Sequence, residues 1–383
     1  MDRDLISLKD VLRNCTASLD LSFHKIGDEG VIALVDALRL CPMLTTLKFR
    51  DNCIGHKGAM LLATALRNFP LLTFLDLSCN RLGIKGARAL AAALPNCKAL
   101  MTLKLDSNRL GIKGARALAA ALPNCKALTF LDLSYNEIGI EGAILLAAAL
   151  PNCPALTYLD LAYNEIDNVG AFSLAAALPN CPALTYLNLD YNKIGNEGAI
   201  SLAAALPNCP ALMNLYLGTN EIGNEGAISL AAALPNCEAL MNLYLGCNKI
   251  RNEGAVSLAA ALPNCPALMN LDLFYNEIGN NGAISFADAL PHCPLLMCLD
   301  LDGNYDIDVA MAYKIDSLAR LQPQHKATAA LVCWNRRRHT VFGRDVNRVF
   351  VAFLLAFFRL DLDTNLDMVE ETLESFHRFG LDA

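Results

Sequence analysis

The sequence predicts a right-handed α/β solenoid, shaped as a horseshoe with a parallel β-sheet on the concave face and helices on the convex face. Three observations lead to this prediction. An asparagine returns every 28 residues, alternating leucines precede it, and an apolar stripe at helical spacing follows it. A fixed period of this length indicates stacked supersecondary units. The recurring asparagines are Asn52, Asn80, Asn108, Asn136, Asn164, Asn192, Asn220, Asn248, Asn276 and Asn304.

The strand of each unit precedes its asparagine, as residues 184–211 illustrate. From Leu187 to Asp190 apolar and polar residues alternate, which is the pattern of a short strand with one buried face. The helix follows the asparagine. Asn196 is expected to cap it, and Pro207 is expected to end it, because proline lacks an N–H group and restricts the residue before it. The apolar stripe of this helix comprises Ile200, Leu202, Ala203 and Leu206.

Stacking follows from the size of one unit. A single unit cannot bury its own apolar face, whereas adjacent copies can. Helices are wider than the strand spacing of about 4.8 Å, so the stack must curve with its strands inside. At the corner after each strand, backbone groups leave regular pairing and need partners. An asparagine side chain offers two donors and an acceptor, so the asparagines are expected to form a structural ladder between turns. His24 takes this place in the first unit.

The phrase Leu-x-x-Leu-x-Leu-x-x-Asn-x-Ile/Leu resembles the leucine-rich repeat. Its 28-residue length and the helix phrase Gly-Ala-x-x-Leu-Ala-x-Ala-Leu are similar to the ribonuclease-inhibitor-like subclass. That subclass also includes the sensor arrays of NOD-like receptors and the Ran GTPase-activating proteins. The resemblance covers residues 16–304, ten full units and part of an eleventh, and it implies the general architecture of the array without naming a ligand.

Three segments are expected along the chain: an N-terminal cap at 1–15, the repeat array at 16–322 and a helical C-terminal module at 323–383. In the last segment, residues 344–360 and 365–379 have helical patterns. This module is interpreted either as a cap packed on the array or as a docking or oligomerisation element. Its basic cluster at 336–339 is interpreted as a solvated turn, with a nucleic-acid or nuclear-targeting patch as the weaker alternative.

The fifteen cysteines indicate core packing rather than disulfides or metal ligation. Nine share one repeat position, which Phe69 takes in the second unit, so the position requires a buried apolar group. No Cys-x-x-Cys cluster is present to suggest a metal site. We therefore expect reduced thiols in the core. The nine are Cys41, Cys97, Cys125, Cys153, Cys181, Cys209, Cys237, Cys265 and Cys293.

The bulk composition predicts a cytoplasmic protein without a membrane segment. The 54% hydrophobic content comes from leucine and alanine in every unit, and the longest apolar run, at 349–358, is half of what a bilayer span needs. The N-terminus lacks the basic-then-apolar pattern of a signal peptide. A net charge of −7 argues against nucleic acid and favours a basic protein partner.

The sequence contains no catalytic constellation. It has no phosphate-binding glycine-rich loop, no Gly-x-Ser-x-Gly and no His-Glu-x-x-His. We therefore expect no catalytic residues, no cofactor, no metal and no enzymatic activity.

The polar strand positions of the concave sheet are the predicted protein-binding surface. Rings interleaved with carboxylates supply anchor contacts and orientation. The competing interpretation is that tyrosine and phenylalanine only satisfy β-propensity there. The predicted residues are Phe74, Asp76, Phe130, Asp132, Tyr135, Tyr158, Asp160, Tyr163, Tyr186, Asp190, Tyr191, Tyr216, Tyr244, Asp272 and Tyr275.

Three functional hypotheses remain at this stage. The first is a non-catalytic interaction scaffold that binds a protein on the concave face. The second, which the resemblance to Ran-directed activators implies, is a GTPase-activating protein. Arg50 is the candidate residue that it would supply to the active site of the GTPase. The third is a sensor or effector module that recruits factors through its C-terminal helices.

Overall fold

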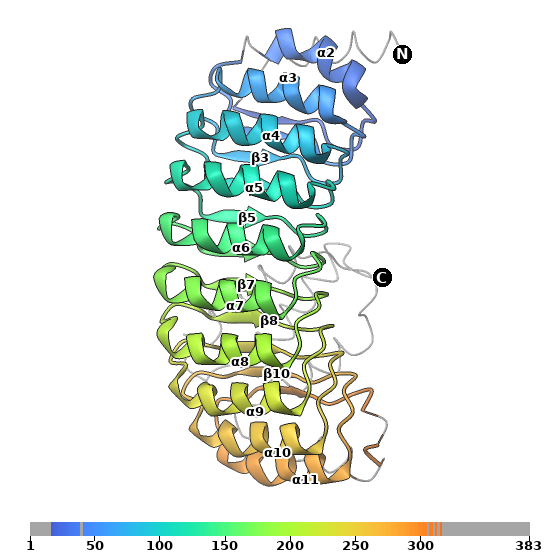
Figure 1. Ribbon diagram of the computed structural model, residues 1–383, viewed down its shortest axis with the longest axis vertical. Coiled ribbons are helices and arrows are strands. Elements are labelled where there is room, and N and C mark those ends of the chain that lie inside the picture. The colour runs from blue at the N-terminus through green and yellow to red at the C-terminus, as the bar shows by residue number, and fades with distance from the viewer. Residues whose placement is uncertain (1–16, 39–40, 305, 309–310, 312–314, 316–383) are drawn as a thin grey trace, which may run out of the picture. The chain divides into compact units, whose positions relative to one another are not determined.

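The computed structural model describes residues 17–38, 41–304, 306–308, 311 and 315. The predicted N-terminal cap at 1–15 and the C-terminal module at 323–383 lie outside the described residues. Within the described part, eleven strands alternate with ten α-helices (Figure 1). Repeat numbers below follow the strands, so that repeat 3, for example, contains β3 and α4.

The strands are three residues long. They are β1 (Ser18–Asp20), β2 (Thr46–Lys48), β3 (Phe74–Asp76), β4 (Thr102–Lys104), β5 (Phe130–Asp132), β6 (Tyr158–Asp160), β7 (Tyr186–Asn188), β8 (Asn214–Tyr216), β9 (Asn242–Tyr244), β10 (Asn270–Asp272) and β11 (Cys298–Asp300).

The α-helices are ten to twelve residues long. They are α2 (Gly27–Leu38), α3 (His56–Leu66), α4 (Gly83–Ala93), α5 (Gly111–Ala121), α6 (Gly139–Ala149), α7 (Asn168–Ala177), α8 (Asn196–Ala205), α9 (Asn224–Ala233), α10 (Asn252–Ala261) and α11 (Asn280–Ala289). A 3-10 turn follows each helix from α4 to α11, such as Leu206–Asn208 after α8.

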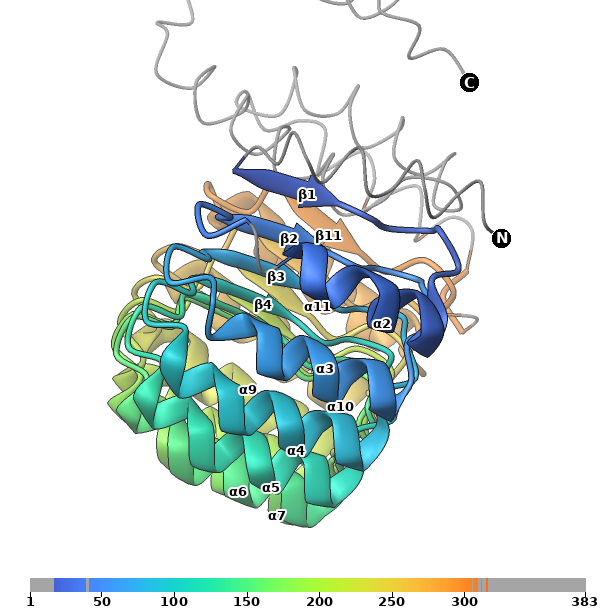
Figure 2. The same cartoon turned by 90° about the horizontal axis from the view of Figure 1, so that it is seen from above.

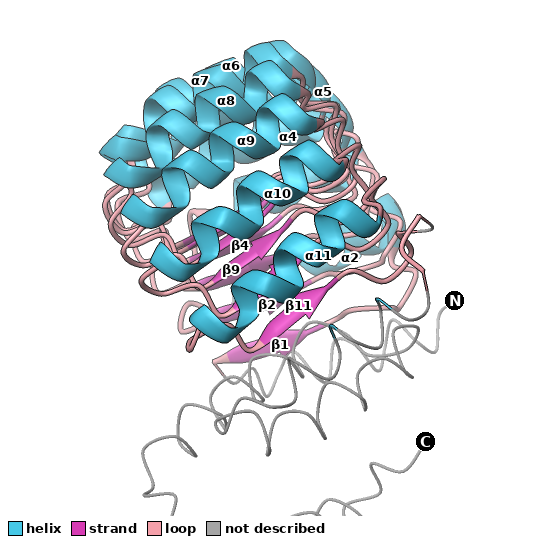
Figure 3. Ribbon diagram, turned by 90° about the horizontal axis from the view of Figure 1, so that it is seen from below, coloured by secondary structure: helices cyan, strands magenta, loops and turns pink. Residues whose placement is uncertain are grey.

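All eleven strands form one parallel sheet in chain order. Each strand pairs with the next in a constant register, so that Leu187 lies between Leu159 and Leu215. The helices cover the outer side of this sheet and leave the strands on the inner side (Figures 2 and 3). The predicted solenoid, with its sheet on the concave face and its helices on the convex face, is confirmed.

The core between sheet and helices is built from repeated columns. Leucines such as Leu187, Leu189 and Leu202 are at most 3% exposed. The helices approach closely because glycine and alanine occupy facing positions: a Cβ added at Gly226 would lie 2.9 Å from the Cβ of Ala199. The cysteine column also lies in or against this core, where all thirteen described cysteines are free and Phe69 takes the same slot fully buried. The packing role predicted for the cysteine column is confirmed.

The asparagine ladder has the bridging role that the sequence predicts. The Asn136 side-chain amide donates to the carbonyls of Leu133 and Ser134 in its own turn, and to that of Leu105 in the preceding repeat. Its Oδ1 accepts the Asn108 backbone N–H at 3.0 Å. The amide therefore joins two turns whose polar groups are buried from water. The ten ladder asparagines are between 0% and 8% exposed.

Three expectations about the helix of the type unit need correction. Asn196 does not cap α8; its Oδ1 accepts the N–H groups of Gly223 and Gly226 at the start of α9 in the next repeat. Ile200 is 41% exposed rather than in the core stripe, because its position points outward. The helix ends at Ala205, and Pro207 lies inside the following 3-10 turn instead of directly ending the helix.

Candidate functional site

A ladder of stacked rings runs across the strands of repeats 5–9. Phe130 stacks on Tyr158 with ring centroids 3.9 Å apart, and Tyr158 stacks on Tyr186 at 4.1 Å. The ladder then shifts to the neighbouring column, where Tyr216 and Tyr244 stack at 4.1 Å. Tyr186 joins the two parts through a tilted contact with Tyr216 at 5.0 Å. The strand spacing of about 4.8 Å permits this stacking of equivalent rings.

A second ring ladder lies at the corner where the strands end. Tyr135, Tyr163 and Tyr191 stack with centroids 3.8 Å apart at both steps. Each tyrosine directly precedes a ladder asparagine and has a left-handed φ between 54° and 57°. Such a φ is uncommon for a residue with a Cβ, and the asparagine bonds hold the turn in it. The structural ladder thus positions the rings that the sequence assigned to the binding surface.

Three strand carboxylates lie deeper than the sequence predicts. Asp76, Asp132 and Asp160 are 6%, 5% and 0% exposed, although alternation placed them toward solvent. Each accepts a hydrogen bond from the backbone N–H two residues later, at 2.9–3.0 Å. Side chains of adjacent strands crowd together on the concave side of a curved sheet, so short side chains are covered there. The expectation of solvent-facing carboxylates is wrong at these three positions.

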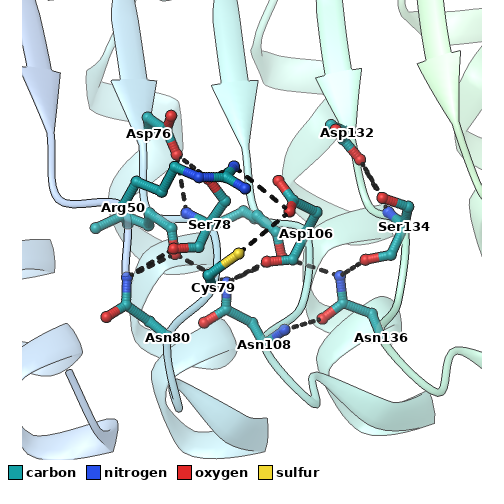
Figure 4. A network of polar contacts seen from close by, with 12 residues as sticks. Arg50, Asp76, Ser78, Cys79, Asn80, Asp106, Asn108, Asp132, Ser134 and Asn136 are labelled. Atoms are coloured by element: carbon teal, nitrogen blue, oxygen red, sulfur yellow. Dashed lines mark hydrogen bonds and ion pairs between the residues drawn. The ribbon is translucent and has the colours of Figure 1, made fainter. Parts of the chain in front are cut away.

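A polar network in repeats 2–4 contains residues that sequence reasoning missed (Figure 4). Arg50 donates to Ser78 Oγ at 3.1 Å, and its Nη1 lies 3.9 Å from Asp106 Oδ2. The Cys79 thiol also donates to Asp106, at 3.8 Å. Burial and the carboxylate of Asp132 raise the pKa of Asp106 to about 6, and Arg50 opposes that shift. The sequence signal was the change from Asp-x-Ser in repeats 3 and 5 to Lys-x-Asp in repeat 4.

The other predicted residues are less closely grouped. Phe74 stands apart from the ring ladders, between Lys48 and Lys104, whose Nζ atoms lie 5.8 and 5.9 Å from its ring centroid. Asp190 accepts the Gly218 N–H at 2.6 Å.

At the far end of the array, Tyr275 is 46% exposed and contacts Phe274 rather than a ladder tyrosine. Asp272 accepts the Phe274 N–H at 2.8 Å. In repeats 8–10 the first ring column is replaced by an amide ladder, in which Asn270 donates to Asn242 and Asn242 donates to Asn214.

A hollow of about 210 Å³ between repeats 9 and 10 is lined by apolar side chains, including Leu268 and Leu296, with no convergent polar side chains. Across the described ranges, no group of three His, Cys, Asp or Glu side chains is placed to hold a metal ion. No helix in those ranges has the length and hydrophobicity that crossing a bilayer requires.

The family model described as Leucine Rich repeat matches nine segments of the chain, which together span more than half of it. The chain belongs to the leucine-rich repeat family. The segments are residues 18–35, 40–63, 70–91, 124–147, 152–175, 180–203, 208–231, 237–259 and 264–287. No curated protein sequence matches this leucine-rich repeat protein.

Solved structures similar to this leucine-rich repeat protein include an internalin, InlF, from Listeria monocytogenes. The match is 20% identical, covers 80% of this chain and 86% of that chain, and has a TM-score of 0.47. The plant peptide hormone receptor RGFR1, in complex with RGF2, is 17% identical over 78% of this chain and 46% of that chain, with a TM-score of 0.47. Internalin C2 from Listeria monocytogenes is 19% identical over 64% and 83%, with a TM-score of 0.42.

Proposed function

We propose that this leucine-rich repeat protein is a non-catalytic scaffold of the ribonuclease-inhibitor-like subclass that binds a basic protein segment on its concave face. The observation that carries the proposal is the pair of ring ladders in repeats 5–9, with carboxylates on β5 and β6. Arrays of this kind typically present an extended concave surface to other proteins. We also propose a cytoplasmic location, because the described cysteines are free and a reducing compartment keeps thiols in that state.

The ring ladders support binding because they are ordered before a partner arrives. Rings stacked at 3.8–4.1 Å have little rotational freedom left to lose on association. Tyr135 and Tyr191 are each 46% exposed, so part of the corner ladder is open to contact. An aromatic anchor of this kind is a common source of binding energy at interfaces.

The carboxylates support a basic partner. Asp132 and Asp160 lie on the same strands as the rings of Phe130 and Tyr158. Their negative charge favours approach of a cationic segment, and the hydrogen bonds to backbone N–H groups hold their side chains in place. A lysine- or arginine-rich peptide lying across the strands would contact the rings directly and would be attracted by the field of the covered carboxylates beneath the surface.

GTPase activation has less support from the described residues. Arg50 was the residue expected to supply a positive charge to another protein, and it is engaged by Ser78 and Asp106 within the sheet. An arginine supplied in trans has to reach the partner's phosphate groups. The recruitment hypothesis depends on residues 323–383 and remains a prediction.

The test is binding of a fluorescent lysine- and arginine-rich peptide, followed by anisotropy at low and high salt. Replacing Tyr135, Tyr163 and Tyr191 together with serine should weaken binding by about tenfold or more, because the exposed anchor ladder is lost. Asp160 is a poor choice for this test, since it supports the backbone N–H of Ala162. An acidic peptide of the same length should not bind.

The matched control is Met101→Ser, which removes an apolar side chain that is 47% exposed outside the ring ladders. It should bind the basic peptide like the unmodified protein. Circular dichroism must show that the triple variant is folded. Equal peptide affinity for a folded triple variant and the unmodified protein would refute binding on the corner ladder.

A further inference from the structure

An apolar column runs along the outer surface of the helices, on the opposite side from the ring ladders. The residue eight positions after each ladder site is exposed in the described repeats, and in eight of ten it is apolar. Adjacent helices pack directly on one another, so the six apolar residues from α6 to α11 form one continuous stripe, which Arg88 and Arg116 separate from Ile32 and Met60. The eight residues are Ile32, Met60, Ile144, Phe172, Ile200, Ile228, Val256 and Ile284, which are 37–61% exposed.

The outward column is most apolar at the middle of the array. Phe172 and Val169 on α7 are 61% and 53% exposed, and Ile140 and Ile144 on α6 are 40% and 37% exposed. These two helices are neighbours in the middle of the array (Figure 1). Large exposed apolar side chains grouped in this way mark an interaction surface.

Charge on the same outward positions has opposite sign on the two sides of this centre. Before it, repeats 2–4 present Lys57, Lys85, Arg88, Lys113 and Arg116. After it, repeats 7–9 present Glu197, Glu225 and Glu253. Repeat 5 contributes Glu141, which pairs with Arg116 at 3.8 Å while both side chains stay about two-thirds exposed, 65% and 67%. Such a pair is weak and leaves Arg116 available to a second partner.

We propose that a second copy of this chain binds this convex surface in antiparallel orientation, with a two-fold axis between α6 and α7. The rotation places the apolar centre of one copy on that of the other, so that Phe172 meets Ile144 of the second copy. It also places repeat 4 opposite repeat 7, repeat 3 opposite repeat 8 and repeat 2 opposite repeat 9. Arg116 then faces Glu197, Arg88 faces Glu225 and Lys57 faces Glu253.

Charge complementarity selects a second copy as the occupant. A two-fold interface pairs one surface with itself, so it needs a surface whose two halves complement each other. The basic and acidic halves of this surface meet that condition in antiparallel orientation. In parallel orientation like charges would face each other, at a cost that disfavours association. Because both surfaces are convex, the central helices make the direct contact and the outer charges act over longer distances.

The experiment is sedimentation equilibrium of the full chain over a range of protein and salt concentrations. The protein should form a dimer that dissociates as salt rises, because the exposed charges are screened. Phe172→Glu should abolish the dimer, since it places two unpaired carboxylates in the apolar centre. Met101→Glu, at an exposed apolar site outside the stripe, should leave dimerisation unchanged.

A charge exchange separates this arrangement from a nonspecific apolar contact. Glu225→Lys places a lysine opposite Arg88 and should weaken the dimer by about threefold at low salt, because the pair acts across the gap between two convex surfaces and the two-fold axis repeats it. Adding Arg88→Glu to the same chain restores opposite charges and should recover most of that loss. A monomer at every concentration, or a double variant that dissociates more than Glu225→Lys alone, would overturn the proposal. The first outcome would leave a foreign protein as the occupant of the stripe.

Discussion

Repeats 3–5 and repeats 7–10 have the same ladder asparagine and nearly the same helix sequence, yet they begin their helices differently. In repeats 7–10 the residue before the helix is extended, and an asparagine of the preceding repeat accepts two N–H groups at the helix start. In repeats 3–5 the helix begins at a glycine with a φ of 57–66°, and that glycine donates to the carbonyl of the next ladder asparagine. The helix start therefore depends on a neighbouring repeat.

The residue that decides between the two arrangements lies one repeat upstream. Repeats 7–10 follow units that carry asparagine at this position, whereas repeats 3–5 follow His56, Ile84 and Ile112, which supply no acceptor there. Two further repeats agree with this explanation. Asp28 caps the helix of repeat 2 through Gly55 and Gly58. Repeat 6 follows Ile140 and instead uses its own Asp167 as the N-cap.

The largest expected effect on stability comes from the ladder asparagine, which repeats 3–5 and repeats 7–10 share. Asn136→Ala should lower the free energy of unfolding by about 2–4 kcal/mol, because several buried backbone groups lose their partner. Asn248→Ala should cost less, since its Oδ1 accepts from Ile222 and it is 7% exposed, whereas Asn136 Oδ1 accepts from both Asn108 and Leu110 in a fully buried site. Urea unfolding of both variants measures the difference. Equal costs would contradict this ranking.

The polar network in repeats 2–4, around Asp106, should give the next largest effect on stability, and this effect depends on pH. The raised pKa of Asp106 means that the folded state holds its proton more tightly than the unfolded state. This contribution to stability is present below about pH 4 and is lost as the pH rises through about 6. Asp106→Asn should therefore stabilise the protein by about 1–3 kcal/mol at pH 7 and have little effect at pH 4.

Thermal unfolding of Asp106→Asn and the unmodified protein at both pH values makes this measurement. Repeats 8 and 9 carry Gly218 and Gly246 at the equivalent position and so have no counterpart carboxylate, whereas repeat 7 carries Asp190, which accepts the Gly218 N–H. A stabilisation that is the same at pH 4 and pH 7 would show that proton binding at Asp106 is not its cause.

The glycines at the two kinds of helix start, Gly111 in repeat 4 and Gly223 in repeat 8, allow a more direct comparison. Gly111→Ala should destabilise the protein by about 1–2 kcal/mol, because its φ of 61° is unfavourable for a residue with a Cβ. Gly223 has a φ of −103°, so Gly223→Ala should change stability by only about 0.5 kcal/mol after the Asn196 side chain adjusts. Chemical unfolding distinguishes the two, and a larger loss at Gly223 would reject the comparison.

A further small effect should appear one repeat away from its mutation. Asn196→Ala should cost about 1 kcal/mol and should increase hydrogen exchange at the Gly223 and Gly226 amides, which lose their cap. The control is Ile112→Ala, at the equivalent position in repeat 4. It should leave hydrogen exchange at the start of α6 unchanged. Faster exchange confined to α8 itself would contradict capping between repeats.

The period, the composition of the columns and the alternation in each strand were sufficient to predict the parallel sheet, the helices and the ladder. They also predicted that Tyr135, Tyr163 and Tyr191 share one column. They could not predict the depth of Asp76, Asp132 and Asp160, because alternation assigns a face of the sheet and not the crowding on that face. The same limit explains Asp106, whose environment depends on Arg50 and Asp132 from repeats on either side.

By itself, the sequence determined the repeat unit and the order of its parts, because periodic hydrophobicity and the asparagine requirement act within 28 residues. The tertiary structure decided which turn each asparagine serves. Asn196 looked like the cap of its own helix, yet stacking brings its side chain to the helix start of the next repeat. Hydrogen bonds follow distance in space, and in a solenoid the next repeat can be closer to a side chain than its own helix start.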